Sequence, residues 1–313
     1  MLPPCQPLLF VFLDGVGLGA DEPLENPFVS ASTPTLTGLL GGPLTASRKP
    51  FFKAVQQDHH APALFNALDA QLGVPGLPQS ATGQTALLTG RNAAQIMGRH
   101  YGPYPGPTLK KLLEQNTLFH DLEQVKQPPA LAPALAPALA NVYPPQFYSR
   151  AKVNAIVYAA QQAGVRLRGL DDYQQEQAIS ADLDGQYLAQ QQAGPNVHPQ
   201  VMGARLAALA AKHRLTLFDF WLSDTAGHRW SLAEASKLVT KLDAFLGGVL
   251  AARPPQLTVL ITSDHGNLED KTQKSHSHAA VPLIVIGPGA LAFGKVQSLL
   301  DIAPAIRQHF GLV

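Results

Sequence analysis

The chain has 313 residues; 46% are hydrophobic and only 14% are charged, with 23 basic and 22 acidic side chains. Such a chain can bury a large core, which excludes an intrinsically disordered protein, and its balanced charge argues against binding to nucleic acid or to an anionic membrane. The apolar run near the start is far shorter than the ~18 residues of a membrane span, and no export signal precedes it. With a lone cysteine, Cys5, we expect a protein of the reducing cytoplasm.

The first predicted element is a buried strand at residues 8–13, which is apolar on both faces. Asp14 follows at its carboxyl end, where open α/β sheets place their ligands, although an Asp that only caps its own turn is the structural alternative. Gly15, Gly17 and Gly19 come next, but the residues after them are typical of a loop. A dinucleotide-binding motif needs a helix to begin there, so we predict no nucleotide cofactor.

The segment at residues 80–90, which reads Ser-Ala-Thr-Gly-Gln-Thr-Ala-Leu-Leu-Thr-Gly, predicts a turn that leads into a short helix. Ser80 then lies at or just before the helix N-terminus, where backbone N–H groups and the helix dipole favour an anion such as phosphate. A serine at this position is often only an N-cap. It becomes a nucleophile where a divalent metal lowers the pKa of its hydroxyl.

The middle of the chain, residues 95–197, is rich in Pro, Gln and Tyr. A proline repeat at residues 128–140 predicts an extended connector, and a helix at 150–163 is expected to precede a strand at 165–168. Single cores stop growing near ~250–300 residues. We therefore predict a smaller α+β cap domain at 95–197, inserted into a discontinuous metal-binding catalytic core of residues 1–94 and 198–313. A long excursion of the same domain is the alternative.

The remainder of the chain alternates between helices and apolar strands. Helices are expected at residues 199–213, 231–252 and 299–310, and strands at 215–222, 257–262 and 282–286. The helix at 231–252 begins with a capping box formed by Ser231 and Glu234. This alternation indicates an α/β fold, in which helices cover both faces of a mostly parallel sheet.

Residue types that commonly serve as metal ligands follow two of these strands. Asp224 and His228 are four residues apart, so on a helical turn both reach one point; the alternative is an exposed helix start that Asp224 caps. Asp264 and His265 are adjacent at the end of another strand and can serve one metal ion or two, unless they only form a structural turn. Carboxylate and neutral imidazole suit Zn²⁺ or Mn²⁺.

Two loop histidines, His276 and His278, precede the last predicted strand. Such histidines usually lie at the surface, but their position beside a strand favours a ligand role for one of them. With Asp14 and the two pairs above, the chain offers three Asp and three His ligands plus a hydroxyl, which is enough for two metal ions. Two metals about 4 Å apart stabilise the attacking and leaving oxygens of a phosphoryl transfer.

The ordered set resembles the alkaline phosphatase superfamily of two-metal phosphoryl- and sulfuryl-transfer enzymes. Within it, the chain looks most like the branch of cofactor-independent phosphoglycerate mutase and phosphopentomutase. The resemblance is carried by Leu13-Asp-Gly15, Asp224-Thr-Ala-Gly-His228, Asp264-His-Gly-Asn267 and His276-Ser-His-Ala-Ala-Val-Pro282. The segment 80–90 is similar to the nucleophile segment of the alkaline phosphatases, and residues 300–304 to the closing helix of the group.

The resemblance implies that Ser80 is the nucleophile and forms a phosphoseryl intermediate, with Thr82 as the second choice. It implies one metal held by Asp14, Asp264, His265 and the Ser80 oxygen. A second metal is held by Asp224, His228 and His276. His276 is preferred to His278 because the histidine of the family lies six residues before the proline that begins the next strand. The cofactors are two divalent ions, Zn²⁺ or Mn²⁺, with Mg²⁺ also permitted.

The predicted function is that of a phosphomonoester hydrolase acting on a small phosphorylated metabolite. A phosphomutase of the related branch is the alternative, which we rank second because the cap has few basic residues to retain a phosphorylated sugar acid. Those present are Arg99, Arg150, Lys152, Arg166 and Arg168. A non-catalytic metal-binding protein on the same scaffold is a further alternative. The substrate, the residues that bind it and the oligomeric state are left open.

Overall fold

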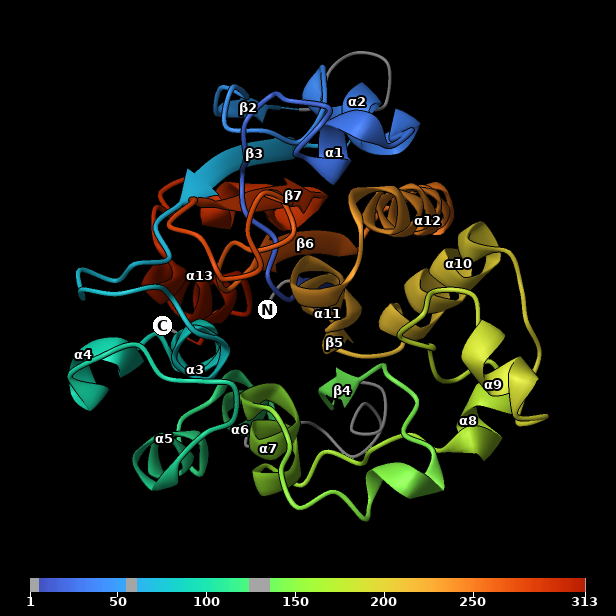
Figure 1. Cartoon of the computed structure of the whole chain (residues 1–313). Coiled ribbons are helices and arrows are strands. Elements are labelled where there is room, and N and C mark those ends of the chain that lie inside the picture. Colours follow the sequence, from blue (N-terminus) through green and yellow to red (C-terminus); the bar gives the residue numbers. More distant parts are fainter. Residues whose placement is uncertain (1–5, 55–60, 124–135, 313) are drawn as a thin grey trace.

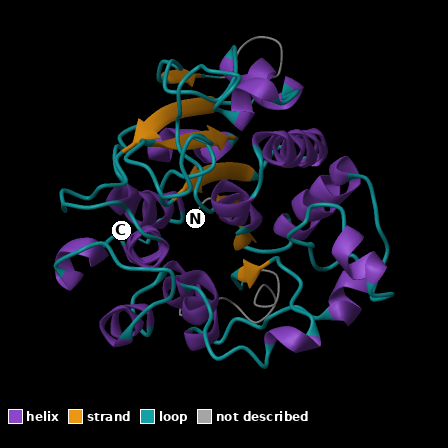
Figure 2. Cartoon of the chain, in the orientation of Figure 1, coloured by secondary structure: helices purple, strands orange, loops and turns teal. Residues whose placement is uncertain are grey.

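The computed structural model of this chain describes residues 6–54, 61–123 and 136–312. Within these ranges one mixed sheet has the strand order β2-β3-β7-β6-β1-β5-β4 (Figures 1 and 2). The strands are β1 (Leu8–Leu13), β2 (Phe51–Lys53), β3 (Ala63–Leu68), β4 (Ala138–Leu139), β5 (Leu215–Phe220), β6 (Thr258–Ser263) and β7 (Val281–Ile286). The α/β class predicted from the sequence is confirmed.

The prediction of a mostly parallel sheet is wrong for half of it. β1 runs parallel to β5 and β6, and β4 runs parallel to β5, whereas the pairs β6–β7, β7–β3 and β3–β2 are antiparallel. No crossover helix connects β6 to β7 in the described structure, and the chain between them stays at one edge of the sheet. Without a crossover, the next strand returns antiparallel.

Helices cover both faces of the sheet, as predicted. Side chains of β1 alternate between two hydrophobic clusters: Leu9 and Val11 pack towards α10 (Pro199–Ala210) and α12 (Leu232–Ala252), and Leu8 and Phe10 towards α3 (Ser80–Thr89), α7 (Ala155–Gln162) and α13 (Ile302–His309). Figure 1 shows α10 and α12 on one side and α3 and α13 on the other. The other helices are α1 (Pro27–Ser30), α2 (Pro34–Leu40), α4 (Ala93–Met97), α5 (Pro107–Leu113), α6 (Leu118–Glu123), α8 (Leu170–Gln174), α9 (Gln186–Gln190) and α11 (Leu222–Arg229), with 3₁₀ turns η2 (Pro145–Phe147), η3 (Pro288–Phe293) and η4 (Leu299–Asp301).

Several predicted helices are confirmed with changed ends. The capping box of Ser231 and Glu234 begins α12. α10 ends earlier than expected, and the expected helix at 299–310 is divided into η4 and α13. α7 begins at Ala155 because the Asn154 side chain accepts a hydrogen bond from the N–H of Val157.

The segment 95–197 packs as part of the main body. β4 joins the sheet beside β5, Tyr173 belongs to one hydrophobic cluster and Ile156 to the other. The predicted strand at 165–168 forms only an isolated bridge, between Arg168 and Val142. Shared sheet and shared cores favour the alternative of a long excursion over a separately packed cap. The predicted connector at 128–140 lies outside the described residues up to residue 135, and its end forms β4.

Candidate active site

The predicted site residues gather at the carboxyl edge of the three parallel strands. Leu13 of β1 is in register with Phe220 of β5 and with Ser263 of β6, so these strands end at the same level. The residue after each strand therefore emerges at one place. There the chain carries Asp14 after β1, α11 with Asp224 and His228 after β5, and Asp264 and His265 after β6.

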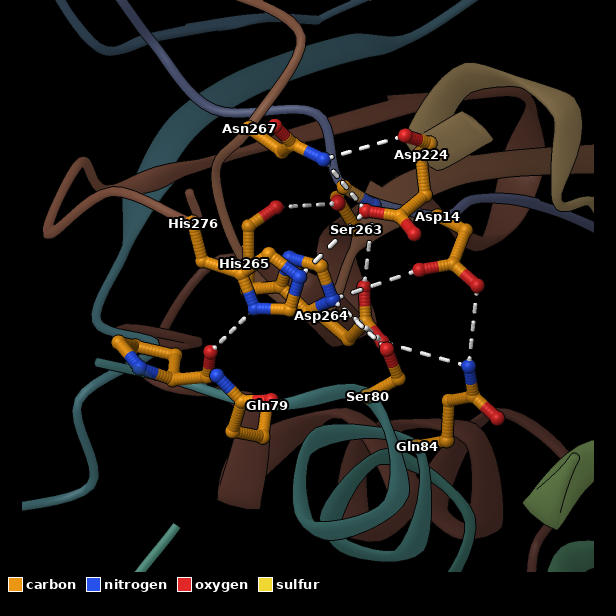
Figure 3. Close-up of polar contacts among 12 residues, drawn as sticks. Asp14, Gln79, Ser80, Gln84, Asp224, Ser263, Asp264, His265, Asn267 and His276 are labelled. Atoms are coloured by element: carbon orange, nitrogen blue, oxygen red, sulfur yellow. Dashed lines mark hydrogen bonds and ion pairs between the residues drawn. The ribbon is translucent and has the colours of Figure 1, made fainter. Parts of the chain in front are cut away.

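Ser80 is the first residue of α3, as expected, and its side chain is buried. Its Oγ lies 3.0 Å from Nε2 of His265 (Figure 3). Thr82 has a different environment, because its hydroxyl donates to the carbonyl of Gln79 at 2.9 Å and accepts from the N–H of Tyr101 at 3.2 Å. The backbone therefore occupies the Thr82 hydroxyl, whereas the Ser80 hydroxyl faces the histidine.

The first group of potential ligands is Asp14, Asp264 and His265, whose ligand atoms all lie within 4.8 Å of one another. Nε2 of His265 is 3.4 Å from Asp14 Oδ1 and 3.7 Å from Asp264 Oδ2. Because this same nitrogen also faces Ser80, the set is no Ser-His-Asp relay, which uses the two imidazole nitrogens for different partners. Asp14 Oδ1 is buried and has no hydrogen-bond partner among the described residues.

The two buried carboxylates of this group need a nearby positive charge to be stable in their ionised form. Burial, together with the charge of Asp264, raises the pKa of Asp14 well above its ordinary value, and burial likewise raises the pKa of Asp264. Burial opposes protonation of His265, yet the neighbouring Asp14 carboxylate raises the pKa of His265 overall. Two buried carboxylates side by side are costly unless a cation compensates them, so these residues fit a divalent metal.

The second group is Asp224, His228 and His276, again with ligand atoms within 4.8 Å of one another. Nδ1 of His228 lies 2.6 Å from the carbonyl of Lys274, and Nδ1 of His276 lies 2.7 Å from that of Pro78. A carbonyl only accepts, so in each neutral ring the proton is on Nδ1 and Nε2 carries a lone pair.

These lone pairs point at each other. The two Nε2 atoms are 3.2 Å apart, and Asp224 Oδ1 lies 3.4 Å from that of His228 and 3.6 Å from that of His276. With both rings neutral, these three atoms are acceptors that converge on one place, which is the kind of site that a Zn²⁺-like cation fits, with each imidazole oriented by its outer hydrogen bond.

Protonation in this group is divided unequally. Burial lowers the pKa of His276 to about 4, helped by the charge of His265. The adjacent Asp224 carboxylate raises the pKa of His228. Burial by itself would raise the pKa of Asp224, but His228 and His265 hold it at about 2. Asp224 is thus ionised and His276 neutral near pH 7, which are the forms that coordinate metals.

Of the two loop histidines, His276 joins the group and His278 does not. His276 is 8% exposed and its ring stacks on that of His265 with centroids 3.8 Å apart. His278 lines a separate surface cavity of about 480 Å³ together with Asp69 and Gln297. The structure therefore brings together all seven residues named from the sequence: Asp14, Ser80, Asp224, His228, Asp264, His265 and His276.

Three further residues, which the sequence did not predict, organise the site. Gln84 donates from Nε2 to Asp14 and Asp264, and Asn267 donates from Nδ2 to Asp224 Oδ1 at 2.6 Å. Buried Glu269 accepts the N–H groups of Gly17 and Asn267 and the hydroxyl of Ser277. The helical spacing of four residues between Ser80 and Gln84 is the one signal that could have revealed Gln84.

Glu269 also explains part of the glycine cluster. A Cβ at Gly17 would lie 2.5 Å from Glu269 Oε1, so only glycine permits this close approach. Gly15 has a φ of +67° and turns the chain directly after Asp14. These glycines shape the loop beside the site.

Most of the basic residues considered for phosphate binding interact elsewhere. Arg166 forms an ion pair with Asp172 at 2.6 Å, and buried Arg168 donates to the carbonyl of Gln177. Arg99 lies over the ring of Tyr101 and Arg150 over that of Phe147.

A family model described as the metalloenzyme superfamily matches residues 6–313. The chain belongs to this superfamily. Among named relatives, it is 33% identical over 146 residues to a phosphopentomutase of a Methylobacterium species, which is 43% of this chain and 35% of the relative. It is 30% identical over 116 residues to a 2,3-bisphosphoglycerate-independent phosphoglycerate mutase of Thiobacillus denitrificans, or 34% of this chain and 23% of the relative. The matched stretches thus span about a third or less of these relatives.

Solved structures show the same fold over nearly the whole chain. A Pyrococcus horikoshii protein matches with a TM-score of 0.54 at 14% identity, covering 98% of this chain and 97% of its own. The alkaline phosphatase of the Antarctic bacterium TAB5 matches with a TM-score of 0.52 at 15% identity, covering 99% of both chains. The predicted resemblance to the alkaline phosphatase superfamily and its mutase branch is confirmed. Among the described residues, no helix has the length and apolar character to cross a membrane.

Proposed function

We propose that this metalloenzyme transfers the phosphoryl group of a small phosphorylated metabolite through Ser80. The observation that carries the proposal is the convergence of two ligand groups beside a buried serine hydroxyl at a helix N-terminus. In each group, carboxylate and imidazole ligand atoms lie within 4.8 Å of one another. Asp14, Asp264 and His265 would hold one divalent ion, and Asp224, His228 and His276 the other. When bound, such ions lower the pKa of a coordinated hydroxyl and stabilise the charge of the phosphate oxygens.

The reaction has two displacements. The deprotonated Ser80 Oγ attacks phosphorus, so that the Oγ–P bond forms while the bond from phosphorus to the ester oxygen breaks, and the departing oxygen takes up a proton. A second acceptor then attacks the phosphoserine, and Ser80 regains a proton as its bond to phosphorus breaks. If that acceptor is water the enzyme is a hydrolase, and if it is another hydroxyl of the substrate the enzyme is a mutase.

The named relatives favour the mutase over the hydrolase that the sequence favoured. Both relatives described above are mutases, although they match over only part of their lengths. The hydrolase keeps one specific support, since Arg166 and Arg168, two basic residues available to retain a phosphate, are engaged in internal bonds. We therefore propose phosphoryl transfer as the activity and mutase chemistry as its preferred form.

A substrate panel separates the two forms. Purified protein loaded with Mn²⁺ or Zn²⁺ is incubated with pentose phosphates, phosphoglycerates and other sugar phosphates, and both free phosphate and isomerised product are measured. Isomer without free phosphate establishes the mutase, and stoichiometric phosphate establishes the hydrolase. A Ser80→Ala variant serves as the matched control for contaminating activity.

Metal analysis tests the rival of a non-catalytic scaffold. Chelation is expected to abolish turnover, and Mn²⁺ or Zn²⁺ to restore it, with about two ions bound per chain. Less than one tightly bound ion per chain, with no recovery on adding metal, would overturn the proposed enzyme. Metal binding without any turnover across the panel would favour the non-catalytic protein.

A further inference from the structure

We infer that Gln84 is a positioning residue that sets the two carboxylates of the first metal group and joins them to α7. This inference rests on the proposed function, because it assigns a role within that metal site. It concerns a residue other than the six Asp and His ligands and the nucleophile, and it gives the segment 95–197 a direct connection to the site.

The position of Gln84 follows from α3. It lies four residues after Ser80, hence on the same face of the helix, and it is fully buried. Its Nε2 is 3.3 Å from Asp14 Oδ2 and 3.4 Å from Asp264 Oδ2. Figure 3 shows Gln84 beside these carboxylates. One amide therefore donates to both carboxylates of the first group.

The other end of the amide accepts. The N–H of Ala155, the first residue of α7, donates to Gln84 Oε1 at 3.2 Å. Because an N–H only donates and ionised carboxylates only accept, these partners define which end of the amide is oxygen and which is nitrogen. A side chain here must donate at one end and accept at the other, which glutamine does and glutamate or methionine does not.

The donated hydrogen bonds have a consequence for metal binding. They occupy Oδ2 of both Asp14 and Asp264 and reduce the repulsion between the two buried charges. They also leave Asp14 Oδ1, the buried oxygen that has no hydrogen-bond partner in the described part of the chain, facing Nε2 of His265. Gln84 thus presents one oxygen of Asp14 for coordination and holds the other.

The N-terminus of α7 is attached at two successive residues. Ala155 is bonded to Gln84 of α3, and Asn154 donates from Nδ2 to Asp219 Oδ2 of β5 at 2.7 Å. A displacement of α7 would therefore pull on the amide that holds the metal carboxylates. The segment 95–197 is therefore connected to the carboxylates of the first metal group by hydrogen bonds within the protein, independently of any substrate.

The test is a Gln84→Met variant, which keeps the length of the side chain and removes all three hydrogen bonds. Both it and its parent carry His228→Ala, which disables the second group, so that calorimetric titration of the metal-free protein with Mn²⁺ reports the first group. Loss of an outer-shell partner is expected to weaken Mn²⁺ binding by about 10–100-fold. Thr85→Val, a buried neighbour whose hydroxyl donates to the carbonyl of Ala81, is the matched control and is expected to bind within about 3-fold of the parent.

The outcomes of the Mn²⁺ titration distinguish failure of the inference from failure of the proposed function. Unchanged Mn²⁺ affinity in a folded Gln84→Met protein, or a lower melting temperature without weaker binding, would overturn the inference and leave the proposed function standing. A parent that binds no Mn²⁺ would instead overturn the proposed function and the inference with it.

Ala155→Pro carries the test if Gln84→Met does not fold. Proline suits the first helical position, and Asn154, with φ −68° and ψ 172°, has the backbone that precedes proline. The change removes the N–H that Gln84 accepts. We expect Mn²⁺ binding at least about 3-fold weaker, through the same outer-shell effect; an unchanged affinity would contradict the link between α7 and the metal group.

Discussion

Nε2 of His228 and Nε2 of His276 lie 3.2 Å apart, and each ring places its Nδ1 against a backbone carbonyl, so that in the neutral rings both Nε2 atoms carry a lone pair. The pair comes from α11 and from the loop before β7, which are brought together only in the folded chain. Two imidazole lone pairs that face each other in this way favour binding of a cation between them, and the outer hydrogen bonds orient both rings towards it.

His276→Ala is expected to remove one ligand of the second group and lower bound metal from about two ions per chain towards one. His278→Ala is the matched control, since His278 lines a separate cavity, and its metal content is expected to stay at two. Elemental analysis of both proteins, prepared without chelator, measures the difference. Loss of metal in His278→Ala but not in His276→Ala would reverse the assignment.

Ser80→Ala is expected to reduce turnover by at least about 10³-fold while leaving metal binding within a few-fold, because the variant removes the attacking oxygen but retains the six Asp and His ligands. Thr82→Val is the matched control, whose hydroxyl is already bonded to the backbone. Steady-state rates and metal titration give both quantities. If Thr82→Val abolishes turnover and Ser80→Ala does not, the nucleophile is Thr82.

Glu269→Ala is expected to lower the free energy of unfolding of the metal-free protein by about 3 kcal/mol, because it leaves the buried N–H groups of Gly17 and Asn267 unpaired. Glu269→Gln retains an acceptor oxygen and is expected to lose only about 1 kcal/mol. Urea unfolding followed by circular dichroism measures both. Equal losses in the two variants would show that charge, and not the accepting oxygen, is what the site requires.

Asp219 predicts a pH dependence of stability. Burial raises its pKa to about 6 from an ordinary value of 3.8, with a hydrogen bond from Asn154 opposing the shift. The folded state therefore binds this proton more tightly than the unfolded state. The stability associated with protonated Asp219 is fully present below pH 3.8 and is lost as the pH rises through 6.

Asp219→Asn removes this titration, so its stability relative to the natural chain is expected to increase between pH 4 and pH 7 by about 3 kcal/mol, the equivalent of a shift of about two pH units. Unfolding midpoints across that range, with metal-free protein, provide the measurement. A constant difference between the two proteins at every pH would contradict the raised pKa.

The sequence by itself determined the residue types of the site, because each metal-binding motif is local and directly follows an apolar strand. Asp14 after β1 and the pair Asp264 and His265 after β6 needed only the rule that parallel strands end at one edge. The cap of α12 was equally local, since Ser231 and Glu234 are three residues apart. Such features depend on short spacings that a single sequence displays.

The tertiary structure decided what depends on partners far apart in the chain. The antiparallel half of the sheet includes the pairing of β3 with β7, whose residues are more than 200 positions apart in the chain. The segment 95–197 joins the main body through the pairing of β4 with β5. Gln84 and Asp264 are 180 residues apart, and Gly17 and Glu269 are 252 residues apart. A hydrogen bond between such residues leaves no periodicity in the sequence, because its geometry exists only once both segments have packed against the same edge of the sheet.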